Sequence, residues 1–168
     1  MHYCGLRNYD VANGPGVRVT LFVSGCRNHC KGCFQPETWD PNYGDVYNRR
    51  IEMTILEWLE SPNITGFTLL GGDPFEPENL ETCTKLCKRI KEEFPNKTIW
   101  CYTGYFYEDL EDKEIMNYID VLVDSPFDLE KRDYSHKFRG STNQRILKLR
   151  GGKVYARPYN MFTSEVDR

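Results

Sequence analysis

Apolar and polar residues alternate along several short segments of the chain, which predicts β-strands. The clearest segment is Val17–Val23, where three valines and a threonine supply the β-branched side chains that strands favour. Ile64–Leu70, Thr98–Tyr102 and Ile119–Val123 predict three further strands, and Arg145–Leu149 allows a fifth. A sheet is therefore the central feature that the pattern predicts.

Between these segments, apolar residues recur every three or four positions, which predicts helices. The best-defined helix has Pro77, a residue suited to a first helical turn, near its start, and Pro95 lies just beyond its end. Its apolar positions are Leu80, Cys83, Cys87, Ile90 and Phe94. Two more helices are predicted over Ile51–Leu59 and Glu108–Tyr118.

The alternation of strands with helices predicts an α/β fold with a mostly parallel sheet and flanking helices, because each parallel connection needs a crossover. The chain has 168 residues, enough for one domain with a real core, and we expect residues 1–168 to form a single domain. Residues from about 150 to 168 match no pattern that we can interpret, so they are expected to form a C-terminal tail of unknown role.

Four polar segments follow the four predicted strands. A cysteine-rich loop follows the first, Gly-Gly-Asp-Pro at 71–74 follows the second, Tyr-Thr-Gly at 102–104 follows the third, and Asp124 follows the fourth. In α/β folds, ligands bind at the carboxyl ends of the strands. We therefore expect these segments to converge on one ligand site at one edge of the sheet.

The first of these loops contains Cys26, Cys30 and Cys33. Thiolates are soft ligands that select zinc, copper(I) or iron–sulfur clusters. A structural zinc site and a cubane cluster both take four ligands, so three cysteines leave one position open for something that is not protein. The alternative is zinc with a remote fourth ligand. His29 lies within the loop, but its short spacing from the cysteines makes simultaneous binding awkward.

The chain has seven cysteines, an odd number that fits poorly with a disulfide framework. The other four, Cys4, Cys83, Cys87 and Cys101, are expected to be small buried core residues. The sequence has no signal-peptide pattern and no apolar run near the ~20 residues of a membrane span. We therefore expect a soluble, cytoplasmic protein with no membrane partner.

Charge is distributed unevenly along the chain. Residues 1–130 contain 12 Lys and Arg and 22 Asp and Glu, a net charge of −10, whereas residues 131–168 contain 10 and 3, a net charge of +7. A basic segment raises the question of nucleic acid, but we see few aromatic residues and no nucleic-acid-binding motif in it. An acidic protein partner or an anionic ligand is the preferred interpretation, and a solvated basic face is the alternative.

The Cys-x3-Cys-x2-Cys spacing resembles that of the radical S-adenosylmethionine superfamily, which has a Gly-Gly-Glu-Pro-like segment similar to residues 71–74. The runs Asn-Gly-Pro-Gly-Val-Arg at 13–18 and Phe-Gln-Pro-Glu-Thr-Trp-Asp at 34–40 look like those of the activating enzymes of glycyl radical proteins. Further runs are similar to the branch that acts on anaerobic ribonucleoside-triphosphate reductase: Cys-Lys-Gly-Cys-Phe (30–34), Trp-Cys-Tyr-Thr-Gly-Tyr (100–105), Val-Leu-Val-Asp (121–124) and Arg-Gly-Ser-Thr-Asn-Gln (139–144). The resemblance runs from about Tyr9 to about Leu149.

This resemblance implies an incomplete (partial) β/α barrel of the radical S-adenosylmethionine type, since a full barrel needs more than ~200 residues. It implies that Cys26, Cys30 and Cys33 hold one [4Fe-4S] cluster, whose fourth iron binds S-adenosylmethionine. The implied reaction is reductive cleavage of this cofactor to methionine and a 5′-deoxyadenosyl radical. The radical takes a hydrogen atom from a glycine of the anaerobic ribonucleoside-triphosphate reductase, with a flavodoxin or ferredoxin as the implied electron donor.

The resemblance also implies which residues contact S-adenosylmethionine. Many members of the superfamily have an aromatic residue just before the third cysteine, against the adenine, whereas this chain has Gly32 there and an aromatic residue just after. The expected contacts are Gly32, Cys33, Phe34, Gly71, Gly72, Asp73, Pro74 and Asp124. For Asp124, a turn or helix-capping aspartate is the alternative.

Two other functions stay open at this point. One is activation of a different, formate-lyase-like glycyl radical enzyme, and the other is a non-catalytic iron–sulfur or zinc module for electron transfer or sensing. For the activating enzyme, four basic residues predict a face that docks the reductase: Arg139, Arg145, Lys148 and Arg150.

Overall fold

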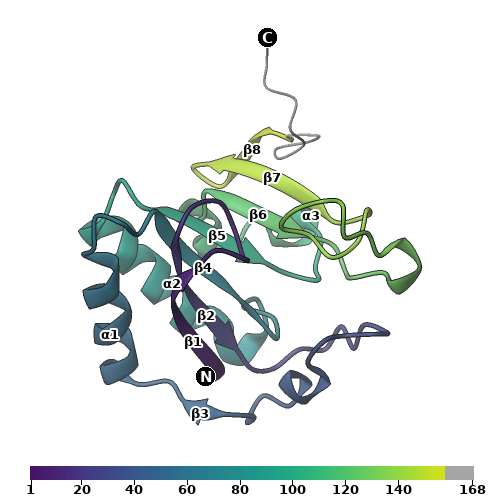
Figure 1. The fold of residues 1–168 in the computed structure, drawn as a ribbon, viewed down its shortest axis with the longest axis horizontal. Coiled ribbons are helices and arrows are strands. Elements are labelled where there is room, and N and C mark those ends of the chain that lie inside the picture. Colours follow the sequence, from purple (N-terminus) through teal and green to yellow (C-terminus); the bar gives the residue numbers. More distant parts are fainter. Residues whose placement is uncertain (158–168) are drawn as a thin grey trace.

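One eight-stranded sheet forms the centre of the fold, in the order β3-β1-β2-β4-β5-β6-β7-β8 (Figure 1). The computed structural model describes residues 1–157. The strands are β1 (His2–Asp10), β2 (Arg18–Val23), β3 (Asp45–Val46), β4 (Gly66–Gly71), β5 (Thr98–Tyr102), β6 (Val121–Asp124), β7 (Arg145–Arg150) and β8 (Lys153–Ala156).

The sheet is mixed, so the prediction of a mostly parallel sheet is wrong. Only the central strands β2, β4, β5 and β6 pair in parallel, whereas β1 pairs antiparallel with β2 and β3, and β7 pairs antiparallel with β6 and β8. The prediction followed the helix-linked strands and missed β1, β3 and β8. Strands joined without a long crossover can pair antiparallel, and this holds for β1 with β2 and for β7 with β8.

The helices differ from the prediction in one place. Helix α1 (Arg49–Leu59) and helix α2 (Pro77–Glu93) form where apolar spacing predicts them. The predicted helix over 108–118 is instead a short helix α3 (Tyr107–Leu110) followed by a 3-10 helix η2 (Glu114–Asn117). Its buried residues Leu110 and Ile115 are five positions apart, about 140° around a helix, so one continuous helix would not bury both on one face.

Helices α1 and α2 cover one face of the sheet, where the main core lies. Alternate strand residues such as Leu21, Leu69 and Ile99 point to this face and pack with buried residues of both helices. Cys83, Cys87 and Cys101 are fully buried in this core, and burial raises the pKa of Cys87 to about 12. The expectation of small core residues is confirmed for these three cysteines, whereas Cys4 is half-buried.

The opposite face of the sheet holds a smaller cluster that is centred on Trp100 and flanked by the buried Arg18. The Arg18 guanidinium donates to Thr68 Oγ1 (2.6 Å), to the Thr98 carbonyl (2.8 Å) and to the Pro15 carbonyl (3.2 Å). These bonds satisfy a buried charge, and they fasten the loop before β2 across the sheet. The loop before β2 therefore covers this face near the amino ends of β2 and β5.

The last described residues extend the sheet. The predicted tail begins at the end of β7, and residues 153–156 form the edge strand β8. The remaining part of the predicted tail, residues 158–168, lies outside the described residues. Within residues 1–157, no helix has the length and apolarity needed to cross a membrane.

Candidate metal and cofactor site

The predicted site segments converge on one cavity of about 400 Å³ at the carboxyl ends of the parallel strands. Of the predicted site residues, seven line it: Cys26, Cys30, Cys33, Phe34, Gly71, Gly72 and Asp73. Residues 102–104, at the end of β5 and just beyond it, also line the cavity, as the topology predicts. Gly32, Pro74 and Asp124 do not line it. The structure thus brings the cysteine loop and the loops after β4 and β5 together in one hollow.

All three cysteines of the loop are free thiols at the cavity wall and are half-buried. Burial raises the pKa of Cys26 and of Cys30. Within residues 1–157, no three His, Cys, Asp or Glu side chains are grouped so as to hold a metal ion. An iron–sulfur cluster binds its thiolates on separate irons, so its ligands surround a volume rather than one point. Three thiols that open on a shared cavity fit that requirement.

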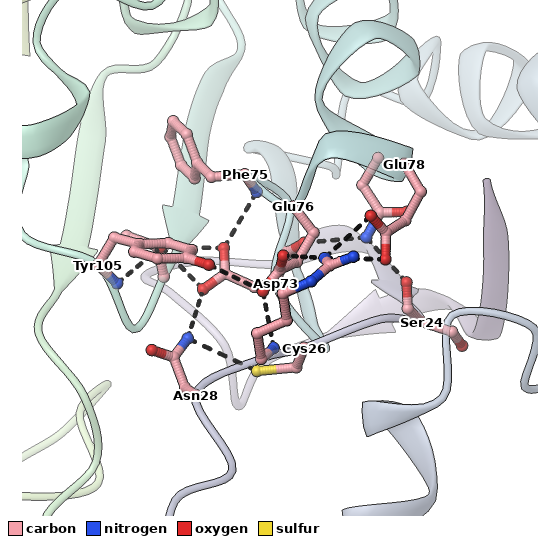
Figure 2. A network of polar contacts seen from close by, with 11 residues as sticks. Ser24, Cys26, Asn28, Asp73, Phe75, Glu76, Glu78 and Tyr105 are labelled. Carbon is pink, nitrogen blue, oxygen red and sulfur yellow. Dashed lines mark hydrogen bonds and ion pairs between the residues drawn. The ribbon is translucent and has the colours of Figure 1, made fainter.

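Each of the three residues between Cys26 and Cys30 is anchored in a different way. Arg27 donates its main-chain N–H to Glu76 Oε1 (2.7 Å), and its guanidinium pairs with Glu76 and Glu78. Asn28 reaches inward, toward the loop after β4 (Figure 2). His29 stacks on Trp39, with 4.5 Å between the ring centroids, and does not line the cavity. The geometry of the cysteine loop is therefore set by contacts on three sides.

Asn28 links a cysteine sulfur to a buried carboxylate. Its Nδ2 lies 3.6 Å from Cys26 Sγ and donates to Asp73 Oδ2 at 3.1 Å (Figure 2). A Cβ on Gly104 would lie 2.4 Å from the same Nδ2, so only glycine leaves room for the Asn28 amide. The sequence pattern gave no signal for Asn28, because its importance depends on a partner 45 residues away.

Asp73 joins the loops that follow β2, β4 and β5. Its fully buried carboxylate accepts hydrogen bonds from Thr103 Oγ1 (2.9 Å) and from the N–H groups of Gly104 (2.9 Å) and Phe75 (3.0 Å), in addition to Asn28. Burial raises the pKa of Asp73 to about 6, against the lowering effect of these hydrogen bonds. Asp73 is therefore a structural link in the cavity wall, and its carboxylate already has four donors.

The two glycines before Asp73 allow the ends of β2 and β4 to approach closely. Gly72 donates its N–H to the Val23 carbonyl (2.7 Å), and Asp73 donates to the Gly25 carbonyl (2.7 Å). A Cβ on Gly72 would lie only 2.4 Å from the Gly25 carbonyl oxygen. Glycine is required here by the packing of the two loops.

The residues around Cys33 form the aromatic wall of the cavity. Phe34 is 75% exposed, and its ring lies 6.4 Å from that of Phe127, another residue of the wall. Gly32 packs over Leu129, outside the cavity: a Cβ there would lie 2.9 Å from Leu129 Cδ1. This places the aromatic rings beside the third cysteine without an aromatic residue at position 32.

Asp124 lies at the end of β6, but its side chain binds other groups of the protein and does not line the cavity. The fully buried carboxylate accepts from Tyr107 N, at the start of α3 (2.8 Å), and from Arg145 Nε (2.9 Å), with a further ion pair to Arg145 Nη2. These contacts match the alternative interpretation of Asp124 as a capping aspartate. Arg145 also pairs with Glu108 (2.7 Å), and its expected role in a face that docks the reductase stays a prediction.

Comparison with known proteins identifies the family of this chain. A family described as a 4Fe-4S single cluster domain matches residues 12–147. The chain is similar to anaerobic ribonucleoside-triphosphate reductase-activating proteins, with 44% identity to that of Vibrio cholerae over 87% of this chain and 97% of the relative. It is 40% identical to those of Enterobacteria phage T4 (87% and 93%) and Escherichia coli K12 (89% and 100%). No solved structure gives a significant match. The chain therefore belongs to the family of anaerobic ribonucleoside-triphosphate reductase-activating proteins.

Proposed function

We propose that this protein activates an anaerobic ribonucleoside-triphosphate reductase by radical S-adenosylmethionine chemistry, as an oxidoreductase. One observation carries the proposal: Cys26, Cys30 and Cys33 open on the same cavity as the Gly-Gly-Asp segment at 71–73. The relatives' names supply the partner. These cysteines would hold a [4Fe-4S] cluster, and the cluster would supply the one-electron chemistry that cleaves S-adenosylmethionine and leads to a glycyl radical on the reductase.

The residues of this chain would bind and shield the reactants. The three cysteines supply the thiolates for the cluster, and the backbone of Gly71 and Gly72 would accept the cofactor's amino group. Apolar side chains such as Phe34 and Phe127 line the same cavity and would exclude water from the reacting atoms.

The shape of the sheet suits a macromolecular substrate. The strands β3 and β8 form its two edges, so the sheet does not close on itself. We propose that residues 1–168 form a single domain of the partial-barrel type, whose open side admits a glycine-bearing segment of the reductase. A flavodoxin or ferredoxin would supply the electron. All seven cysteines are free thiols, which suits the reducing cytoplasm.

Anaerobic reconstitution with iron and sulfide tests this function. The protein should become brown and, after reduction, cleave S-adenosylmethionine to 5′-deoxyadenosine and methionine. Addition of the anaerobic ribonucleoside-triphosphate reductase should then produce a glycyl radical in electron paramagnetic resonance spectra. A formate-lyase-like glycyl radical enzyme serves as the control partner and should stay without the radical. A brown protein that cleaves no S-adenosylmethionine would instead be a non-catalytic iron–sulfur module.

Removing the Asn28 amide should shift the reduction potential of the cluster. Hydrogen bonds to cluster sulfur atoms favour the reduced, more negative cluster, and Asn28 Nδ2 is placed to donate one to Cys26 Sγ. We expect Asn28→Ala to lower the potential by about 40 mV, equivalent to roughly 1 kcal/mol for one hydrogen bond. A redox titration followed by electron paramagnetic resonance measures this shift. Asn42→Ala, at an exposed turn, is the control, and equal potentials in both variants would contradict the role of Asn28.

A further inference from the structure

Arg139 is the only lysine or arginine among the described residues that line the cavity. It lies on the connection between β6 and β7, within the Arg-Gly-Ser-Thr-Asn-Gln run at 139–144. The only carboxylate in the described lining is that of Asp73. The Asp73 oxygens accept hydrogen bonds from four other groups, and no ion pair joins them to Arg139. Among the described residues that line the cavity, Arg139 therefore has no ion-pair partner.

The protein holds the Arg139 segment in a fixed turn. Arg139 Nη1 donates to the Gln144 carbonyl (3.0 Å), and Gln144 Oε1 accepts from the Gly140 N–H (2.8 Å). The Gln144 amide also donates to the carbonyl of Ser125, beyond the end of β6 (3.4 Å). Asn143 adds a bond to the carbonyl of residue 126 (2.8 Å). These bonds order the turn before any ligand binds, so a ligand would meet a positioned cation.

Most N–H donors of the Arg139 guanidinium make no hydrogen bond to the described residues, so they can bind a ligand. Arginine has five N–H donors in a planar fork, and the structure shows one hydrogen bond from Arg139 to the described residues. Within residues 1–157, Arg139 has no ion-pair partner. The fork matches a carboxylate through two parallel hydrogen bonds.

This turn borders the cysteine side of the cavity. A Cβ on Gly140 would lie 3.0 Å from the Phe127 ring, so the turn packs directly on that residue. Phe127 in turn contacts Cys30 through its main-chain N–H and Phe34 through its ring. Arg139 therefore belongs to the same part of the wall as Cys30 rather than to a distant surface.

From this geometry we infer that Arg139 binds a carboxylate that enters the cavity. The inference rests on the proposed function, which brings carboxylates to this site from two sources. One is the methionyl carboxylate of S-adenosylmethionine, and the other is a carboxylate of the partner segment that carries the glycine. In either case Arg139 determines specificity for an anionic group beside the cluster cysteines.

Ligand binding to the reconstituted protein separates the two sources. Isothermal titration calorimetry would compare S-adenosylhomocysteine, which keeps the carboxylate, with 5′-methylthioadenosine, which lacks the amino acid. If the cofactor carboxylate is the ligand, Arg139→Gln should weaken binding of S-adenosylhomocysteine roughly tenfold to a hundredfold and leave that of 5′-methylthioadenosine unchanged. Arg139→Lys keeps the charge without the fork and should lose less. Arg132→Gln, outside the cavity and stacked on Tyr134, is the matched control.

A second measurement addresses the partner. Unchanged binding of S-adenosylhomocysteine, combined with glycyl radical formation that needs more reductase in Arg139→Gln, would assign the carboxylate to the partner. Unchanged values in both measurements, or an equal loss for 5′-methylthioadenosine, would overturn the inference. Failure of the wild-type protein to cleave S-adenosylmethionine would contradict the proposed function itself. Normal cleavage by Arg139→Gln, with wild-type affinities for S-adenosylhomocysteine and for the reductase, would contradict only the carboxylate site.

Discussion

Alanine in place of Cys26, Cys30 or Cys33 is expected to abolish the brown chromophore and S-adenosylmethionine cleavage together. A cubane cluster bound by three protein thiolates loses a quarter of its ligand positions with each substitution, and no other cysteine among the described residues lines the cavity. Iron and sulfide analysis, visible absorbance and 5′-deoxyadenosine release after anaerobic reconstitution measure both effects on the same sample.

Cys83 and Cys87 provide the matched controls, because they are also free thiols but are fully buried in the helix-covered core. Cys83→Ala and Cys87→Ala should keep the chromophore and lose only packing, about 1 kcal/mol of stability. Loss of the cluster in Cys83→Ala with retention in Cys30→Ala would show that the thiolates have been assigned to the wrong residues.

Replacing Arg145 with methionine is expected to give the largest loss of stability among the variants considered. Asp124 is fully buried, and Arg145 is the cation that neutralises it, so the substitution leaves a buried carboxylate without its ion pair. The expected cost is about 3 kcal/mol, which corresponds to a fall of roughly 6–12 °C in the thermal midpoint. Differential scanning calorimetry of the protein measures it.

Lys148, on the same strand, supplies the control for this prediction. Among residues 1–157 it has no carboxylate partner, so Lys148→Met should change the midpoint by no more than about 2 °C. Adding Asp124→Asn to Arg145→Met should recover part of the loss, because the amide keeps the cap on Tyr107 without a charge. Equal midpoints for Arg145→Met and Lys148→Met would show that the ion pair does not stabilise the fold.

The sequence was sufficient to predict the centre of the fold and the place of the site. Strands β2, β4 and β5 have clear apolar alternation, and the carboxyl-end rule then placed the cysteines with Gly71, Gly72 and Asp73. Spacing alone singled out the three thiols as candidate cluster ligands, because soft ligands this close together have few other roles.

Features that depend on distant partners were not predictable in the same way. Strand β1 mixes half-buried and exposed residues, so it lacks the alternation that marks a strand with one covered face. The Asp124 carboxylate was expected to face the site, and its partner Arg145 lies 21 residues away on an antiparallel strand that local patterns left uncertain. Asn28 looks like an ordinary loop residue in the sequence, because its partners Asp73 and Gly104 lie near it only in the folded structure.

The anchoring of residues 27–29 has a consequence for how the cluster is assembled. Fixing one residue of a flexible loop costs about 1–2 kcal/mol of conformational entropy, and a metal that ordered its own loop would lose this from its affinity. Here contacts with Glu76, Asp73 and Trp39 order residues 27–29 when the protein folds, so this entropy is already lost before a metal binds. If the proposed function holds, we expect the three thiols to keep their arrangement when iron leaves. We then expect a protein that has lost its cluster to oxygen to rebuild it from iron and sulfide without unfolding and refolding.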